Sequence, residues 1–249
     1  MKIENRPKAV YKYHKINEHL LSLISQNQLW FSHQLALNDP YDCRYSFSDS
    51  YLSSLFTKAT TTLLKDLQDL NPFFKDINQE KFLEIMLPTL KSEKWMNNFY
   101  DLQFGEMLGW CLCCFTTEAE NELMWAHYAD SNKGVCLEFN LSHTPELYEK
   151  LFPVKYSDDY PEINSTDEIV DALFVKRNAW STEKEWRILS NTKGGKIFSK
   201  KSLTGIYFGC NAKASDVEMV KNLLVENNYN NVALKQFKFA GKGIVMTDI

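Results

Sequence analysis

The sequence predicts an α+β fold with a mixed or antiparallel β core and a helical insertion. Strand-like patterns with short helices occupy both ends of the chain, whereas between residues 49 and 105 apolar residues recur at spacings of three to four. The first pattern is typical of half-buried strands and the second of amphipathic helices. We therefore expect a single domain over residues 1–249, with residues 49–105 as a helical insertion.

The chain opens with a predicted β-α-β unit. Residues 10–14 alternate between apolar and polar side chains, Asn17 is placed to cap a helix, and residues 29–32 form a second short strand. Trp30 and Phe31 in that strand are expected in the core. An irregular loop should follow, because Pro40 disfavours helical geometry in the preceding residue.

Proline residues divide the predicted insertion. Pro72 and Pro88 each follow a run of helical spacing. Because proline ends or kinks a helix near the preceding residue, we expect a helix to end or kink at each position.

The second half of the chain returns to strands. We expect a strand at 110–115, a helix at 121–129, a turn at 131–134 and a strand at 135–139. Later strands are predicted at 154–156, 186–189, 196–198, 206–208 and 232–239, and helices near 167–174 and 214–227.

Composition restricts the class of protein. A chain of 249 residues with 44% hydrophobic residues can bury a large core without disulfides. Its formal charge of −4 supplies no global basic surface for nucleic acid or an anionic membrane. The first residues lack an apolar signal region, and no apolar run approaches the ~18 residues that span a bilayer. We therefore expect a cytoplasmic protein without membrane association.

Six cysteines invite a metal interpretation. Cys111, Cys113 and Cys114 lie close together, but no second pair follows at the spacing of a zinc finger. Free cysteine is commonly a small buried hydrophobe. We predict buried thiols and no metal site.

Several blocks of the sequence resemble a bacterial domain family of unknown function. They include Asn38-Asp39-Pro40-Tyr41-Asp42, Met124-Trp125-Ala126-His127-Tyr128, the run from Gly134 to Phe139, and Glu183-Lys184-Glu185-Trp186-Arg187 after Trp180. The blocks come in the order of that family across nearly the whole chain.

Other features resemble mono-ADP-ribosyltransferases. Those enzymes open with a strand that carries an Arg or His, continue through a helix, and later place a glutamate at the start of a strand. This layout looks like that of Tyr13-His14, the helix after Asn17, and Glu183-Lys184-Glu185 before a strand. The Glu-x-Glu form is similar to their arginine-modifying branch, although the Ser-Thr-Ser strand of that branch is absent here. The resemblance implies an ADP-ribosyltransferase-like fold, NAD as the consumed substrate, and a role as a toxin or antiviral defence effector.

The acidic pair suits the chemistry that this resemblance implies. Cleaving the bond between nicotinamide and ribose passes through a cation-like sugar, which a carboxylate stabilises. Glu185 is the candidate for that role, Glu183 could position or deprotonate an acceptor, and Arg187 continues the same face. The alternative is a solvated edge strand whose charges form weak surface ion pairs.

Residues of the first strand are candidates for binding NAD. His14 could donate to a ribose or phosphate, and Tyr11 and Tyr13 could form an aromatic wall. The alternative for His14 is a half-buried strand histidine without function.

Two further segments supply candidate binding residues. Asn38 and Asp39 lie on a rigid loop that suits a ligand clamp or a site of oxygen ligands, or else an Asx turn. Helical spacing places Met124, His127 and Tyr128 on one side of the predicted helix, with Trp125 beside them. They could line a pocket, or Trp125 and Tyr128 could simply pack the helix.

Three functions are therefore compatible with the sequence. The first is an NAD-consuming ADP-ribosyltransferase or NAD glycohydrolase, acting on a small-molecule ligand with a protein or nucleic-acid acceptor. The second is a metal-dependent nuclease using Asp39, Asp42 and Glu138 or Glu185. The third is a non-catalytic module that binds a small ligand or a partner.

Overall fold

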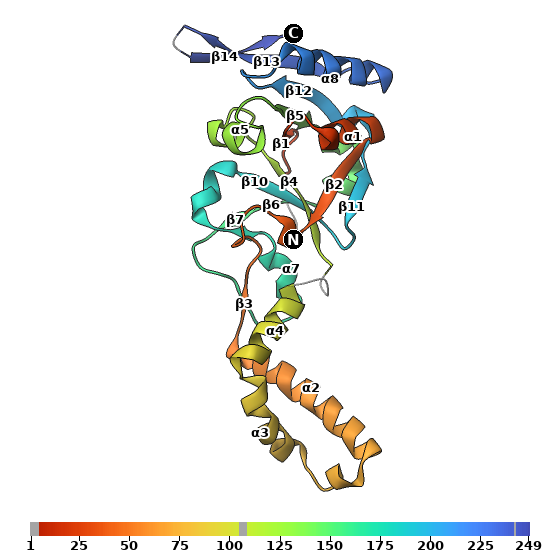
Figure 1. Ribbon diagram of the computed structural model, residues 1–249, viewed down its shortest axis with the longest axis vertical. Coiled ribbons are helices and arrows are strands. Elements are labelled where there is room, and N and C mark those ends of the chain that lie inside the picture. The colour runs from red at the N-terminus through yellow and green to blue at the C-terminus, as the bar shows by residue number, and fades with distance from the viewer. Residues whose placement is uncertain (1–4, 105–108, 242) are drawn as a thin grey trace.

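The computed structural model describes residues 5–104, 109–241 and 243–249. It has a body built on one large sheet and a helical arm that extends from it (Figure 1). The sheet contains β1 (Val10–His14), β2 (Gln28–His33), β4 (Cys111–Thr116), β5 (Val135–Phe139), β6 (Leu151–Pro153), β10 (Glu185–Ser190), β11 (Gly194–Ile197), β12 (Leu203–Phe208), β13 (Ala233–Ala240) and β14 (Gly243–Asp248). The predicted α+β class is confirmed.

The sheet is mixed but mostly antiparallel. Its main path runs β11-β2-β4-β1-β5-β12-β13-β14, and β10 pairs with β4 and β6 outside this path. The pairing of β12 with β13 is parallel, and the other pairings within this sheet are antiparallel. Two small parallel pairs accompany it: β3 (Ser46–Phe47) with β8 (Glu162–Ile163), and β7 (Lys155–Tyr156) with β9 (Val175–Lys176).

Strand β4 is the branch point of the sheet. Its first half pairs with β2 through Leu112 and Ser32, its last residue Thr116 pairs with Tyr11 of β1, and β10 follows its full length on the other side. Because β1 and β2 meet opposite ends of β4, the middle of β4 is left open between them.

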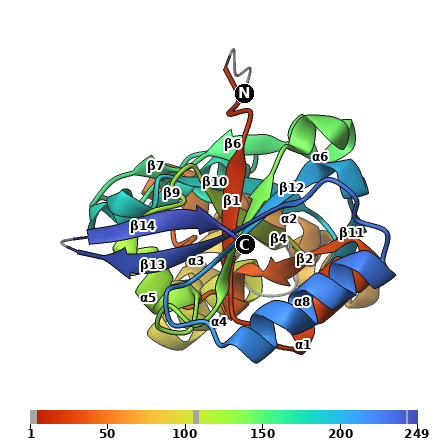
Figure 2. The same ribbon diagram turned by 90° about the horizontal axis from the view of Figure 1, so that it is seen from above.

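The predicted β-α-β opening is confirmed. Asn17 caps α1 (Glu18–Gln26) by accepting hydrogen bonds from the backbone N–H groups of His19 and Leu20. Its apolar face packs into the main core. Seen from above, α1 lies beside α8 (Ala214–Glu226), and the two helices cover the same side of the sheet (Figure 2).

The predicted helical region contains α2 (Asp49–Leu70), α3 (Gln79–Leu90) and α4 (Glu93–Phe104), which form the arm (Figure 1). Its base shares a small core with β3, β8 and α7 (Glu168–Ala172). The expected boundary at Pro72 is confirmed, because α2 ends at Leu70. The helix does not end at Pro88, since α3 continues through Pro88 to Leu90.

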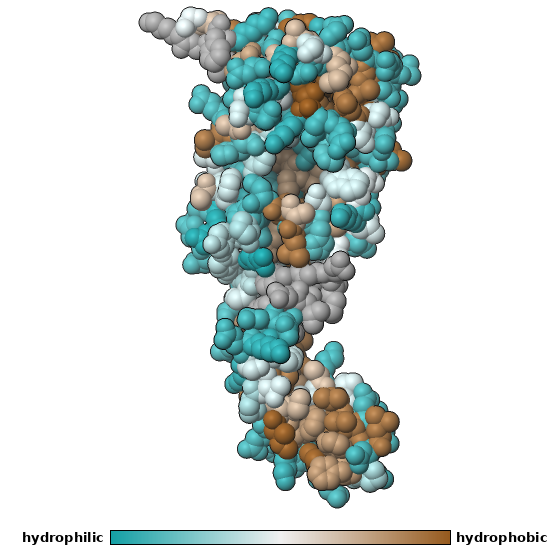
Figure 3. Space-filling view, in the orientation of Figure 1, coloured by the Kyte–Doolittle hydropathy of each residue, from teal (hydrophilic) through white to brown (hydrophobic). Residues whose placement is uncertain are grey.

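Apolar side chains remain exposed on the arm. Figure 3 shows the far end of the arm as mainly hydrophobic on the face in view. The exposed apolar residues of this segment include Leu63, Leu70, Phe73 and Ile85. These four residues do not belong to the small core at the base of the arm.

The second half of the chain follows the predicted order with small shifts. The predicted helix at 121–129 is α5 (Glu122–Tyr128), which Asn121 caps, and the strand after it is β5. No prediction covered the short helix α6 (Pro145–Tyr148) or the strands β6, β8, β9 and β14. Phe31 is buried as expected, but Trp30 is 57% exposed, because alternation along β2 turns its ring away from the core.

None of the helices in the described part of the chain is both long and apolar enough to cross a membrane.

We predict that Gly134→Ala destabilises the fold, because the new Cβ would lie 2.2 Å from the backbone oxygen of His14. Overpacking against a rigid backbone typically costs about 1–3 kcal/mol. Gly195→Ala is the matched control, since its Cβ would meet only the flexible side chain of Gln28. Urea unfolding should show a clear loss for Gly134→Ala alone, and equal losses in both variants would contradict the assignment.

Candidate functional site

A pocket of about 190 Å³ lies where β1 and β2 diverge over β4. Segments that are far apart in the sequence line it together. The residues that line it are Tyr11, Lys12, Tyr13, Trp30, Ser32, Leu37, Asn38, Asp42, Leu112, Cys114, Phe115, Met124, Tyr128, Lys176, Glu183 and Glu185. The acidic pair and the first strand therefore share one pocket.

Strand register explains how the acidic end of β10 reaches the first strand. Glu185 pairs with Thr116 of β4, and Thr116 pairs with Tyr11 of β1. Residues that are directly opposite in antiparallel strands carry their side chains on the same face. Glu185 and Tyr11 are therefore on one face of the sheet, separated by one strand.

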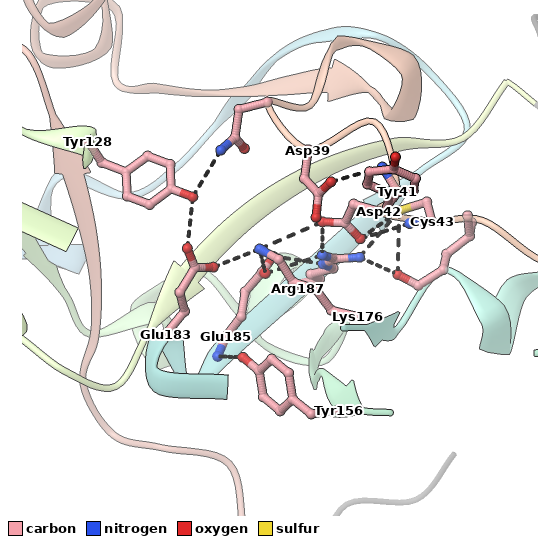
Figure 4. Close-up of polar contacts among 12 residues, drawn as sticks. Asp39, Tyr41, Asp42, Cys43, Tyr128, Tyr156, Lys176, Glu183, Glu185 and Arg187 are labelled. Atoms are coloured by element: carbon pink, nitrogen blue, oxygen red, sulfur yellow. Dashed lines mark hydrogen bonds and ion pairs between the residues drawn. The ribbon is translucent and has the colours of Figure 1, made fainter. Parts of the chain in front are cut away.

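Buried charges form a network beside the pocket (Figure 4). Arg187 is fully buried, and its Nη2 lies 2.6 Å from Oδ2 of Asp42 while its Nε lies 2.7 Å from Oε1 of Glu185. Its Nη1 donates to the carbonyl of Leu173 at 2.7 Å and to Sγ of Cys43 at 3.2 Å. The guanidinium thus ties the start of β10 to two loops.

Lys176 at the end of β9 is the second buried cation. Its Nζ lies 2.6 Å from Oε2 of Glu183, 2.9 Å from Oε2 of Glu185 and 3.7 Å from Oδ2 of Asp42. Burial by itself would lower the pKa of this ammonium, but the three carboxylates outweigh burial and raise the pKa above its ordinary value. Lys176 is therefore a charged partner and not a free nucleophile.

Glu185 is held as a carboxylate. Burial would raise its pKa, but Arg187 and then Lys176 outweigh that effect and lower the pKa to about 2. Each of its oxygens is bonded to a cation, and Tyr156 accepts the hydrogen bond of its backbone N–H at 2.8 Å. Glu185 is the more rigidly fixed of the two glutamates.

Glu183 has a different set of partners. It ends a short 3₁₀ segment, and Lys184 follows in the left-handed region with φ of +44°, so the chain turns between the two glutamates. Tyr128 donates its hydroxyl to Oε1 of Glu183 at 2.7 Å, and Asn38 donates to the Tyr128 oxygen at 3.2 Å. Burial and then the charge of Glu183 raise the pKa of Tyr128, so the phenol stays protonated.

The loop that contains Asn38 and Asp39 contributes to the pocket and to a second cavity beside it. Asp39 accepts from the backbone N–H of Tyr41 at 2.9 Å, which is the predicted Asx turn, and it lines a separate cavity of about 170 Å³. Asn38 and Asp42 line both cavities. The turn therefore presents Asn38 toward Tyr128, whereas Asp39 mainly stabilises the loop.

The remaining candidates lie outside the set of described residues that line the pocket. His14 is half-buried, and burial lowers its pKa to about 4, so the imidazole is neutral. His127 is exposed on α5. Trp125 is buried and donates its indole N–H to the carbonyl of Ala119. Arg187 lies behind the pocket and orients Glu185 and Asp42.

The geometry bears on two alternative interpretations from the sequence, namely a solvated edge strand and a metal site. The solvated edge strand is wrong, because β10 lies between β4 and β6 and its Glu185 and Arg187 are buried. Among the described residues, no group of three or more His, Cys, Asp or Glu side chains is arranged to hold a metal ion. Asp42 and Glu185 instead share the guanidinium of Arg187.

Sequence analysis missed Lys176 and the contribution of Asp42 to the buried network. Lys176 sits in a two-residue strand that gives no periodic signal, and its partners come from sequence positions 42, 183 and 185. Only its position after the buried Phe174, with period-two spacing, indicates an inward side chain.

Residues 124–188 match the model of a family described as a protein of unknown function, DUF2971. The matched segment runs from α5 to β10 and includes Tyr128, Lys176, Glu183, Glu185 and Arg187. The predicted family resemblance is confirmed over this segment. No curated protein and no solved structure matches the chain.

We predict that Arg187→Met destabilises the protein strongly, because it leaves Asp42 and Glu185 buried with less compensating charge. Removing one partner of a buried ion pair typically costs about 3–5 kcal/mol. Lys184→Met is the control, since it breaks an exposed pair with Glu118 that contributes about 0–1 kcal/mol. Similar urea midpoints for both variants would show that the buried network is not a stabilising element.

Glu185 should also contribute to stability in a pH-dependent manner. Its pKa is about 2 in the folded protein and 4.5 ordinarily, so its contribution is present above pH 4.5 and is lost as the pH falls toward 2. We expect the difference in unfolding free energy between the wild type and Glu185→Gln to shrink over that interval. A constant difference from pH 6 to pH 2.5 would contradict the lowered pKa.

Proposed function

We propose that the protein is an NAD-consuming enzyme with an ADP-ribosyltransferase-like fold, which cleaves the bond between nicotinamide and ribose. The observation that supports this proposal is the shared pocket, in which Glu183 and Glu185 face the first strand. Tyr11, Tyr13, Asn38 and Tyr128 also line it. The resemblance of the first strand and of the Glu-x-Glu segment to mono-ADP-ribosyltransferases supplies the reaction class.

The proposed reaction begins with heterolysis of the glycosidic bond. The electron pair of the C1′–N bond moves to the nicotinamide nitrogen, which becomes neutral and leaves, and C1′ becomes an electron-deficient, cation-like centre. A carboxylate close to C1′ stabilises that centre electrostatically. Water or an acceptor nucleophile then bonds to C1′ and gives its proton to a base, which yields ADP-ribose or an ADP-ribosylated acceptor.

The contacts of the two glutamates suggest different roles for them in this reaction. Glu185 is bonded to Arg187 and Lys176 through both oxygens, so it serves as a fixed negative charge. Glu183 is bonded to one cation and to the neutral hydroxyl of Tyr128, so fewer ionic contacts hold its carboxylate away from a substrate. We assign Glu183 as the base that receives the proton of the acceptor, with Tyr128 and Asn38 orienting it.

Aromatic side chains would position the nicotinamide ring. Trp30 is exposed at the pocket, and Tyr128 is half-buried in its wall. Flat rings stack on such surfaces. The same resemblance is the basis for proposing a role as a toxin or antiviral defence effector, since consumption of NAD is harmful to a cell.

The test is release of nicotinamide from NAD by the purified protein, with and without protein and nucleic-acid acceptors. Glu183→Gln should lower the rate by about 100-fold or more, because a positioned acid or base contributes about 10²–10⁴-fold. Glu122→Gln, which changes an exposed glutamate on α5, should leave the rate unchanged. Circular dichroism of both variants should match that of the wild type, which checks that they are folded. No release by the wild type, or an unchanged rate for Glu183→Gln, would refute the proposal.

A non-catalytic binding module is the second candidate. Both glutamates are engaged by cations, and neither His14 nor His127 is among the described residues that line the pocket. A rigid receptor that binds a ligand without proton transfer would have the same arrangement. Calorimetry that detects NAD binding without any release of nicotinamide would support this candidate.

A further inference from the structure

A single row of residues crosses the sheet beyond the pocket. Glu185 pairs with Thr116, Thr116 with Tyr11, Tyr11 with Glu138 of β5, and Glu138 with Gly205 of β12. Opposed residues in antiparallel strands share a face, so this row continues the pocket-side face of the sheet. At about 4.8 Å per strand, Glu138 lies about 14 Å from Glu185 along the sheet.

Glu138 is the polar centre of a second cluster in this row. Its carboxylate accepts a hydrogen bond from Thr204 at 2.7 Å and another from the hydroxyl of Tyr207. The rings of Tyr11 and Tyr207 lie 6.2 Å apart, and burial followed by the charge of Glu138 raises the pKa of Tyr11. The carboxylate, two phenols and one hydroxyl therefore form a connected group.

The cluster retains capacity to accept hydrogen bonds. A carboxylate offers about four lone-pair sites, of which Thr204 and Tyr207 use two. Glu138 and Tyr11 are both half-buried, so solvent reaches them. The next position of the row is Gly205, which adds no side chain of its own and lies under the ring of Tyr207.

The size of the pocket requires that most of a dinucleotide bind elsewhere. Its volume of about 190 Å³ is below the range of roughly 300–1,000 Å³ that is usual for ligand pockets. It can hold one ring with part of its sugar. A ligand that extends from it over Tyr11 reaches Glu138, because Tyr11 belongs both to the pocket wall and to the row.

We propose that Glu138 and Tyr11 form a nucleoside subsite, in which the carboxylate accepts hydrogen bonds from the ribose diol and the ring of Tyr11 stacks with the base. Its assignment to the adenosine half of NAD rests on the proposed function. Carboxylates bind ribose hydroxyls in other dinucleotide-binding folds, and aromatic rings stack with any base. Lys235 lies 5.8 Å from the centre of the Tyr207 ring, where its charge could meet a phosphate of the same ligand.

Calorimetry with adenosine and 2′-deoxyadenosine tests the subsite without NAD turnover. The wild type should bind adenosine about tenfold more tightly, because a hydrogen bond to a charged group contributes about 1.5–3 kcal/mol. In Glu138→Gln the preference should fall to about twofold or less. Glu120→Gln removes the charge of an exposed residue near Tyr11 and should keep the full preference.

A second variant, Tyr11→Leu, tests the subsite independently in case Glu138→Gln does not fold. Tyr11→Leu should weaken both nucleosides by about tenfold while the preference for adenosine remains, because stacking with a base contributes about 1–3 kcal/mol. Equal binding of the two nucleosides by the wild type, or an unchanged preference in Glu138→Gln, would overturn the subsite and leave Glu138 as a link between β5 and β12. A preference for adenosine without nicotinamide release would contradict only the proposed function. Release without the preference would contradict only the subsite.

Discussion

The buried guanidinium of Arg187 is the interaction on which the rest of the site depends. It is fully buried and bonded to Asp42, Glu185, Cys43 and the carbonyl of Leu173. These contacts join β10 to the loop before β3 and to the segment that leads into β9. An unpaired charge at such depth is costly, so the loops must close around it whenever the protein folds.

Closure around Arg187 also fixes the chemistry of the pocket. Lys176 is brought in by the same segment as Leu173, and it bridges Glu183 and Glu185. The two glutamates thereby acquire different environments although they are only two residues apart. One is locked between cations, and the other is shared with the phenol of Tyr128. Different environments for two carboxylates allow different roles in one reaction.

The branched sheet determines where a ligand can lie. Because β1 and β2 pair with opposite ends of β4, the middle of β4 is open, and the pocket forms there. The register of β10, β4, β1 and β5 then lines up Glu185, Tyr11 and Glu138 on one face. The family match covers residues 124–188, which include Lys176, Glu183 and Glu185 of the buried network. Tyr11 and Trp30, which also line the pocket, lie outside the matched segment.

The sequence by itself determined the α+β class, the β-α-β opening with its Asn17 cap, and the helical character of residues 49–104, because periodicity and capping are local. It also singled out Glu183, Glu185, Tyr11 and Tyr128. Only the tertiary structure decided that Lys176 and Asp42 join them and that His14 and His127 lie outside the pocket lining. Those outcomes depend on strand register and on contacts such as that of Lys176 with Asp42, which lie more than 100 positions apart, and no local pattern encodes them.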